Sequence, residues 1–449
     1  MRSLLENAAQ RAIRYLEDVQ ERAVAPAGIA ALSELDRALP AVPTAPENVI
    51  ELLDRYVSPA TMGMAGPRFF GFVFGGALPV TVAANWLGGA WDQNTGLFFS
   101  TPGVSRLEEI ALKWMIELFG FPPETGAGFV TGATMANLSG LAAARNRLYQ
   151  RAGWNVEADG LIGAPPLSVI AGEEAHPTLL KSLGLLGLGR NCITRVPVDA
   201  QGRIRADRFP RVDERTIVCL QAGNVNTGAF DPLAELCKRA RDSGAWVHID
   251  GAFGLWAKAS PALAHLAEGI ELADSWATDA HKWLNVPADS GLAFSRDAAA
   301  LRAAMSISAE YLPKDSVNRD PSDFTPELSR RARGIEVWAA LRCLGREGLA
   351  ELFERNCRGA RTFAQRLSAA GYRILNDVVL NQVLVSFGSP EMTQRVIQGI
   401  QQDGTCWCGG TVWQKQTAMR ISICSWATTD EDVEKSAAAM IRVARACGA

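Results

Sequence analysis

A strand–helix–strand pattern in the middle of the chain restricts the fold more than any other feature. Short apolar runs at residues 216–220 and 246–250 are predicted to be buried strands, and residues 232–243 between them have the pattern of a helix that Gly244 ends. A helical crossover of this length joins parallel strands. Another apolar run at residues 167–171 predicts one more buried strand. The pattern therefore indicates an α/β fold with a mostly parallel central sheet.

Three parts are expected along the chain. Residues 1–65 have helical spacing that prolines interrupt, and we expect a helical N-terminal segment there. Residues 66–325 contain the predicted sheet and are expected to form a large domain. A small α+β C-terminal domain is expected over residues 326–449, with a final helix from Asp430. Its other predicted elements are long helices at residues 327–344 and 349–371 and short antiparallel strands at residues 372–375, 383–387 and 419–423.

Composition and charge argue against several classes of partner. The chain has 449 residues and a net charge of −3, which disfavours nucleic acid or an anionic membrane as a partner. Nine cysteines are too few for a disulfide framework in a chain of this length, so we expect reduced thiols and a cytoplasmic protein. Cys406 and Cys408 lack a second pair at metal-ligand spacing, so no metal site is predicted.

One stretch raises the alternative of a membrane span. Residues 69–91 contain no charged side chain and are long enough to cross a bilayer. Gly71, Pro79 and Asn85 lie inside this stretch, and they suit loops and a buried helix better than a membrane helix. We therefore expect no membrane-spanning segment.

Lys282 is the candidate catalytic lysine. It lies in residues 279–285 (DAHKWLN), shortly after a strand-like run at residues 273–277. The bulky side chains that follow it would partly desolvate the amine, which favours the neutral form that attacks a carbonyl carbon. For this segment taken alone, a structural lysine is the alternative interpretation.

Asp250 is the candidate partner of a cofactor ring. It ends the predicted strand at residues 246–250, at the sheet edge where open α/β folds bind ligands. A carboxylate there can keep a pyridine nitrogen protonated, and Ala252 is small enough for a flat ring to lie against it. The alternative for Asp250 is a loop cap. His248, on the same face of the strand, either orients Asp250 or is an ordinary core histidine.

Two further segments suit an aromatic cofactor that carries a phosphate. Residues 129–137 (FVTGATMAN) begin an alanine-rich helix, whose first N–H groups and positive dipole end favour a phosphate. His176 follows a predicted strand, where it can stack on an aromatic ring or act as an acid or base. The alternatives are a helix that simply begins with small residues and a loop histidine without a role.

Taken in order, these segments resemble the group II pyridoxal-phosphate-dependent amino acid decarboxylases, which include aromatic amino acid, histidine, glutamate and diaminobutyrate decarboxylases. The resemblance rests on a spaced set: residues 131–134 (TGAT), His176, residues 248–252 (HIDGA) and residues 281–283 (HKW). It extends over most of the chain, from about Arg68 to Arg420. It implies a type I aminotransferase-like fold, pyridoxal 5′-phosphate as the cofactor, and a homodimer with active sites at its interface.

The resemblance also implies roles for individual residues. Lys282, His176 and Asp250 would be catalytic: Lys282 would form the internal aldimine, and Asp250 would pair with the pyridine nitrogen. Ala252 would pack on one face of the ring and His176 on the other. Asn224 falls where the family often has threonine near the cofactor. The residues expected around the phosphate are Ala133, Thr134, Ser275, Asp279 and His281. The residues expected to bind substrate, partly across the dimer interface, are Phe72, Phe74, Asn94, Thr95 and Leu97.

The implied reaction is decarboxylation of an L-amino acid to the amine and carbon dioxide, through an external aldimine and a quinonoid. Aromatic amino acid decarboxylases of this group protonate the α carbon with a tyrosine on a mobile loop, whereas residues 314–326 of this chain carry Phe324 and no tyrosine. Tyr311 and His176 are the replacement candidates. Loss of the tyrosine diverts related enzymes toward oxygen, so the alternative is an aldehyde synthase or another pyridoxal-phosphate-dependent carbon–carbon lyase. A non-catalytic cofactor carrier is disfavoured because Lys282 and Asp250 are both present.

Overall fold

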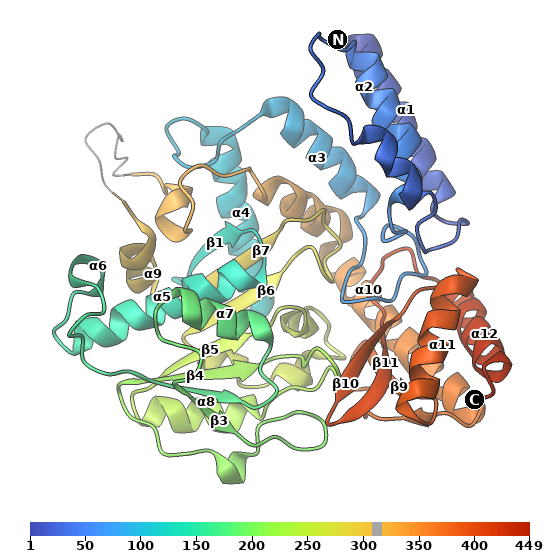
Figure 1. Ribbon diagram of the computed structural model, residues 1–449. Helices are drawn as coiled ribbons and strands as arrows, with labels where there is room; N and C mark the ends of the chain where they lie inside the picture. The colour runs from blue at the N-terminus through green and yellow to red at the C-terminus, as the bar shows by residue number, and fades with distance from the viewer. Residues whose placement is uncertain (308–316) are drawn as a thin grey trace. The chain divides into compact units, whose positions relative to one another are not determined.

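The computed structural model describes residues 1–307 and 317–449, which form two compact units (Figure 1). The larger unit comprises Ala77–Arg358 and Asn376–Gln382, and the smaller unit comprises Met1–Gly76, Gly359–Leu375 and Val383–Ala449. These boundaries differ from the predicted domain ends at residues 65 and 325. The N-terminal and C-terminal segments belong to one unit, because they pack against each other as described below.

The larger unit is built on a seven-stranded sheet in the order β1-β7-β6-β5-β4-β2-β3. The strands are β1 (Gly126–Val130), β2 (Ser168–Gly172), β3 (Ile193–Val196), β4 (Thr216–Gln221), β5 (Trp246–Asp250), β6 (Ser275–Asp279) and β7 (Gly291–Ser295). Only β7 runs antiparallel to its neighbours β1 and β6. The predicted α/β fold with a mostly parallel sheet is confirmed, and β2, β4 and β5 correspond to the three predicted strands.

Helix α5 crosses the middle of this sheet and packs against β5, β6 and β7. It starts directly after β1, with Gly132 as its N-cap. The helices of this unit up to residue 307 are α3 (Pro79–Trp91), α4 (Pro102–Phe119), α5 (Ala133–Arg151), α6 (Val156–Asp159), α7 (Pro177–Leu185), α8 (Leu233–Asp242) and α9 (Ala298–Met305). The uncharged stretch at residues 69–91 ends in α3. Among the described residues, no helix is long and apolar enough to cross a membrane.

Helix α10 (Gly334–Ala369) is interrupted at Gly345, which has a φ of 60°. The break matches the predicted gap between two helices, but the first helix begins at Gly334 and not at residue 327. The reason is that the preceding backbone pairs elsewhere: Thr95 N–H donates to Arg330 O, and Arg330 N–H donates to Asn94 Oδ1, both at 2.9 Å. Because the backbone of Arg330 makes these bonds, the residues before Gly334 do not continue the helix.

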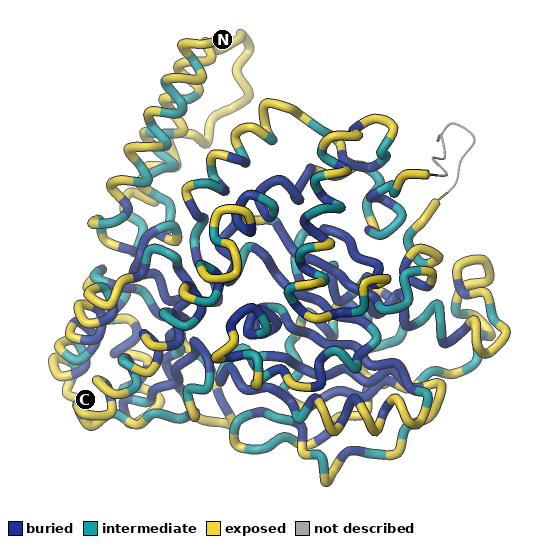
Figure 2. The backbone as a smooth tube through the Cα atoms, turned by 180° about the vertical axis from the view of Figure 1, so that it is seen from behind, coloured by how far each residue is buried: buried dark blue, intermediate teal, exposed yellow. Residues whose placement is uncertain are grey.

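The core of the larger unit is rich in aromatic side chains. The rings of Phe121 and Trp276 stack with centroids 3.9 Å apart, and those of Trp283 and Phe353 lie 4.8 Å apart. Strands β1, β4, β5, β6 and β7 are buried along their whole length, and Figure 2 shows the interior backbone mostly in the buried colour. Trp283 itself is fully buried. Trp283 follows Lys282 in sequence, so the core holds the segment that carries the candidate lysine.

The smaller unit contains a four-stranded sheet in the order β10-β11-β9-β8. Its elements are α1 (Arg2–Asp18), α2 (Pro46–Leu52), β8 (Arg373–Ile374), β9 (Gln382–Ser386), α11 (Pro390–Asp403), β10 (Gly409–Trp413), β11 (Gln416–Ser422) and α12 (Asp430–Ala446). The three predicted strands are β8, β9 and β11, and the final helix starts at Asp430 as predicted. Strand β10 was absent from the prediction.

Arg68 joins the N-terminal segment to the C-terminal part of the smaller unit. Its guanidinium is buried and donates to Asp432 Oδ1 at 2.9 Å and to Thr405 O at 3.0 Å. Phe69 stacks on Trp407 with ring centroids 5.1 Å apart. Through these buried contacts, the first 76 residues pack with the C-terminal part of this unit.

Candidate active site

The carboxyl ends of β5 and β6 lie beside the start of α5. Asp279, the last residue of β6, accepts the N–H of Ala133 on Oδ1 at 2.5 Å, and its own N–H donates to Ala252 O at 2.9 Å. Asp250, the last residue of β5, is joined to the same helix one turn further along through Asn137. Three segments far apart in sequence therefore meet at one sheet edge, which is where α/β folds place ligands.

Lys282 lies in this group on the loop after β6. Its Nζ atom is 2.9 Å from Asp279 Oδ2, and the side chain is 18% exposed, so the amine can be reached from outside. Two hydrogen bonds hold this loop in place: Trp283 Nε1 donates to Asn356 Oδ1 at 2.8 Å, and Asn285 Nδ2 donates to Trp283 O at 2.7 Å. The core thus fixes the backbone of Lys282 while its amine stays accessible.

His281 lies on the other side of Asp279. Its Nδ1 accepts the N–H of Ser290 at 3.1 Å, so the proton of the neutral ring is on Nε2. Nε2 is 3.8 Å from Asp279 Oδ1. Asp279 is almost fully buried. Its carboxylate lies near Lys282, His281 and the first N–H of α5.

Asp250 is buried, and each of its oxygens accepts one hydrogen bond. Asn137 Nδ2 donates to Oδ2 at 3.1 Å, and the N–H of Ala252 donates to Oδ1 at 3.2 Å. Two N–H donors suit a carboxylate anion, because a protonated carboxyl would itself have to donate. Sequence reasoning gave no role to Asn137; the available signal was an amide in an otherwise alanine-rich helix, one turn from the phosphate-binding motif.

His176 is the N-cap of α7 and lies at the same edge of the sheet, beyond the end of β2. Its Nδ1 accepts the N–H of Thr178 at 3.3 Å and is 2.7 Å from the Thr178 hydroxyl. Because Nδ1 accepts, the proton of the neutral imidazole is on Nε2. His176, which was predicted to stack on an aromatic ring or to act as an acid or base, is thus a helix cap with one nitrogen bonded to Thr178.

Asn224 follows β4 and is buried. Its Oδ1 accepts the N–H groups of Asn226 and Thr227 at 2.8 and 3.2 Å. Its Nδ2 has no hydrogen-bond partner among the described residues. A buried donor without a partner costs about 1–3 kcal/mol, so this amide suits a bound acceptor atom.

The backbone at the start of α5 is closely packed on β7. A Cβ atom on Gly291 would lie 2.5 Å from the Cα of Gly132, and a Cβ on Gly132 would lie 3.1 Å from Cε1 of His281. Gly291 therefore requires glycine, because the atoms in the way of a side chain are backbone, and a side chain at Gly132 would press on the His281 ring. The first helical hydrogen bond runs from Ala136 N–H to Gly132 O, which leaves the N–H groups of Thr134 and Met135 ahead of it.

These groups fit pyridoxal phosphate by their chemistry. An accessible amine matches its aldehyde, a carboxylate with no proton of its own matches its ring nitrogen, and the start of α5 together with the unpartnered Asn224 amide offers donors to its oxygens. Among the described residues, no three histidine, cysteine, aspartate or glutamate side chains are grouped so that they could hold a metal ion.

Ser275 lies away from the predicted phosphate position. It starts β6, and its hydroxyl lies 2.8 Å from His248 Nδ1 and accepts the Trp246 Nε1–H at 2.9 Å. The structure therefore brings Ser275 to the residues behind Asp250 and not to the start of α5 at Ala133. Its predicted contact with the phosphate stays a prediction.

The predicted substrate residues stay predictions as well. Phe72 and Phe74 belong to the smaller unit, where their rings lie 5.5 Å apart and Phe72 is 55% exposed. Asn94, Thr95 and Leu97 belong to the larger unit, with Asn94 and Thr95 bonded to the backbone of Arg330 as described above. Tyr311, one of the two replacement candidates for the proton donor, and Lys314, the first residue of the predicted loop, lie outside the described residues.

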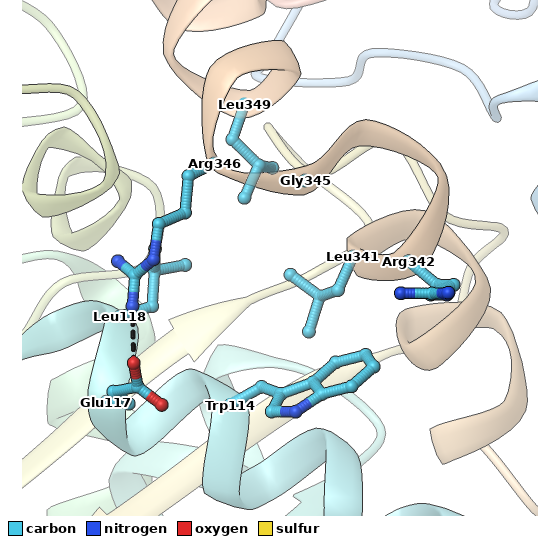
Figure 3. A pocket seen from close by; sticks show the side chains of 8 residues that line it. All are labelled: Trp114, Glu117, Leu118, Leu341, Arg342, Gly345, Arg346 and Leu349. Atoms are coloured by element: carbon cyan, nitrogen blue, oxygen red, sulfur yellow. Dashed lines mark hydrogen bonds and ion pairs between the residues drawn. The ribbon is translucent and has the colours of Figure 1, made fainter.

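A hollow elsewhere in the larger unit contains none of the predicted site residues. It has a volume of about 270 Å³ and lies between α4 and the two halves of α10 (Figure 3). An ion pair between Glu117 and Arg346, 2.7 Å long, lies on one side of it. No titratable pair in it resembles the lysine and aspartates described above, so it is not a candidate active site.

Comparison with known proteins adds independent information. Residues 30–388 match the family model described as the pyridoxal-dependent decarboxylase conserved domain. An aromatic-L-amino-acid decarboxylase of Bacillus atrophaeus is 28% identical over 70% of this chain, and the match spans 65% of that relative's length. A phenylacetaldehyde synthase of Arabidopsis thaliana is 26% identical over 74% of this chain and 72% of its own length. The crystal structure of Oryza sativa TDC with PLP and tryptamine has the same fold, with a TM-score of 0.92, 22% identity and coverage of 99% of this chain and 97% of that chain.

Proposed function

Because this chain belongs to the pyridoxal-dependent decarboxylase family, we propose that it binds pyridoxal 5′-phosphate and converts an L-amino acid to the amine and carbon dioxide. One observation supports the proposal most: Lys282, Asp250 and the start of α5 lie together at one edge of the sheet. When bound, the cofactor supplies an aldehyde that reacts with amines and a pyridinium ring that accepts electrons from the substrate. The side chains of this protein bind and orient the cofactor, and one of them is proposed to protonate the α carbon of the substrate.

Lys282 is the proposed point of covalent attachment. Asp279 holds the amine at 2.9 Å, so the lysine side chain already points in one direction before any ligand binds. Asp250 is proposed to face the ring nitrogen and to keep it protonated. Both oxygens of Asp250 retain a lone pair beyond the one N–H that each accepts, so the carboxylate can accept a third donor.

The start of α5 is the proposed phosphate site. Asp279 already accepts the N–H of Ala133, so the phosphate would use the next donors, at Thr134 and Met135. The unpartnered Nδ2 of Asn224 is proposed to donate to another cofactor oxygen. His176 and Ala252 are proposed to lie on the two faces of the ring, since both lie at the carboxyl edge of the sheet.

His176 is also the proposed proton donor to the α carbon. Its Nδ1 is committed to Thr178, so Nε2 is the nitrogen that can hold the transferred proton. An imidazole suits proton transfer near neutral pH. Because the described part of the 314–326 loop carries no tyrosine, this histidine or Tyr311 must take the role that the loop tyrosine has in the resembling enzymes.

Oxidative conversion to an aldehyde is the second candidate. The observation that favours it is the similarity to phenylacetaldehyde synthases at 26% and 25% identity, alongside the similarity to decarboxylases. The two outcomes differ in their balance. Decarboxylation gives one amine and one carbon dioxide, whereas the oxidative reaction consumes one oxygen and one water and releases carbon dioxide, ammonia and hydrogen peroxide with the aldehyde.

A cytoplasmic homodimer is proposed as the working form, with Phe72, Phe74, Asn94, Thr95 and Leu97 lining the substrate pocket. Three large apolar side chains of α3 support a second copy as the partner. Trp86, Leu87 and Trp91 are 44–54% exposed on the single chain. An apolar helix face of this kind is stabilised when another chain covers it.

The proposed function is tested by labelling and by product balance. Borohydride reduction of the purified protein should fix a pyridoxyl group on Lys282, which peptide mapping identifies. The protein is then incubated with each proteinogenic amino acid while carbon dioxide, amine, ammonia and oxygen are followed together. A label on another lysine, or carbon dioxide from none of the amino acids, would contradict the proposal.

A further inference from the structure

A continuous row of hydrogen bonds runs from Asp250 into the core. Asn137 Nδ2 donates to Asp250 Oδ2 at 3.1 Å, and Asn137 Oδ1 is 2.8 Å from His248 Nε2. His248 Nδ1 is 2.8 Å from Ser275 Oγ, which accepts the Nε1–H of Trp246 at 2.9 Å. The row joins one helix and two strands, because Asn137 is on α5, His248 and Trp246 are on β5, and Ser275 is on β6.

The chemistry of the groups fixes the direction of every bond in this row. An ionised Asp250 only accepts, so the Asn137 amide presents its NH₂ to Asp250 and its oxygen to His248. That oxygen only accepts, so His248 Nε2 carries the hydrogen. In a neutral imidazole Nδ1 is then an acceptor, and the Ser275 hydroxyl must donate to it. The Trp246 indole, which can only donate, completes the row.

Burial keeps the histidine in the row neutral. The side chains of Asn137, His248 and Ser275 have no solvent exposure, and desolvation lowers the pKa of His248 to about 3. Helix α5 also lies directly on the ring: a Cβ on Gly140 would be 2.8 Å from His248 Cε1 and 3.3 Å from Ser275 Cβ. Glycine is unfavourable inside a helix, and here it makes room for the imidazole.

We propose that Asn137, His248 and Ser275 are positioning residues, which hold the Asp250 carboxylate in the orientation that faces the cofactor ring nitrogen. The inference rests on the proposed function, because it assigns a partner to Asp250. It goes beyond that function in giving a defined task to three residues to which the proposed function assigns none. Asn137 cannot rotate its amide without breaking its bond to His248, and His248 cannot move its proton from Nε2 to Nδ1 without breaking its bond to Asn137 Oδ1.

The test follows the ring nitrogen itself. The holoenzyme is prepared with ¹⁵N-labelled pyridoxal phosphate, and the ¹⁵N chemical shift reports whether the ring nitrogen is protonated. Asn137→Leu and His248→Leu should move the shift toward that of an unprotonated pyridine and lower kcat about tenfold, the effect of one lost hydrogen bond, with little change in KM. His248→Gln should restore the signal, because its amide NH₂ can still donate to Asn137.

Ser295→Ala is the matched control. Ser295 pairs with Ser275 across β6 and β7, is equally buried, and donates to Asp297 O outside the row. Its removal should leave the ¹⁵N shift unchanged, whereas Ser275→Ala should move it. Should the leucine variants not fold, Ser275→Ala, which removes a single oxygen atom, decides the question.

The outcomes separate this inference from the proposed function. Wild-type shifts in Asn137→Leu and His248→Leu, or in Ser275→Ala where those do not fold, combined with an altered shift in Asp250→Asn, would overturn the positioning roles and leave the function standing. An unaltered shift in Asp250→Asn would overturn the role of Asp250 and the inference with it. A protein that takes up no pyridoxal phosphate would overturn both.

Discussion

Lys282 Nζ lies 2.9 Å from Asp279 Oδ2, and the other oxygen of the same carboxylate accepts the first N–H of α5. One buried side chain therefore sets the position of the candidate lysine and the start of the candidate phosphate helix together. The amine and the helix start are therefore separated by one carboxylate group, with one of its oxygens on each side. This link is present in the protein without any ligand.

Replacement of Lys282 tests covalent attachment. Lys282→Arg should keep the ion pair with Asp279, and with it the fold, while removing the primary amine. We expect no pyridoxyl label after borohydride treatment and a loss of kcat/KM of at least about a thousandfold. Lys238→Arg is the control, since Lys238 is 73% exposed and pairs only with Asp242. Full labelling of the Lys282→Arg protein would show that another lysine is used.

Asp279 should stabilise the cofactor-free protein through the start of α5. Asp279→Ala leaves the buried N–H of Ala133 without an acceptor, which should lower the free energy of unfolding by about 2 kcal/mol. Asp279→Asn keeps an oxygen in place and should recover most of this loss. Urea denaturation of the two variants measures the difference. Equal stability of the alanine and asparagine variants would contradict the assigned contact.

Asp231 should make the stability of the protein depend on pH. Burial raises the pKa of Asp231 to about 6 from an ordinary value of 3.8, although the N–H groups of Ile204 and Gln221 each donate to it at 2.7 Å. An acid whose pKa is raised by folding is protonated in the folded chain while it is ionised in the unfolded chain. Stability should therefore fall by about 3 kcal/mol as the pH rises from about 4 to 6, and level off above.

The comparison protein for this pH dependence is Asp231→Asn, which cannot ionise. The difference in the free energy of unfolding between wild type and variant should change across that pH range, as measured by denaturant titration at each pH. A difference that stays constant between pH 4 and pH 7 would contradict the assignment. The carboxylate accepts the N–H groups of Ile204 and of Gln221 at the end of β4, and it is not among the proposed cofactor contacts.

His176→Phe separates stacking from proton transfer. Phenylalanine keeps an aromatic face for the cofactor but has no proton to give, so cofactor content should be retained while turnover to amine falls by roughly a hundredfold. The remaining turnover should consume more oxygen per carbon dioxide than wild type. An oxygen electrode and amine quantification give the ratio. Unchanged amine output would transfer the proton-donor role to Tyr311 or another group.

The sequence predicted those parts of the fold and site that depend on local pattern. Apolar runs gave β2, β4 and β5, and the positions of Asp250 and Lys282 just after β5 and β6 followed from the strand ends. The role of Asn137 was not predictable, because its partners His248 and Asp250 come from another segment and are brought near only when α5 packs across the sheet. Ser275 was assigned to the phosphate for the same reason: its orientation depends on tertiary packing.

The close contact between Gly291 and Gly132 has a consequence for redesign of this protein. Strand β7 is the one reversed strand of the sheet, and it contributes no side chain to the proposed site, yet its backbone touches the residue from which α5 starts. Any larger residue at Gly291 would push against the backbone from which α5 starts, beside Asp279. Variation aimed at a new substrate therefore has no freedom at Gly291, so the antiparallel strand is a fixed part of the structure around which the rest of the site can change.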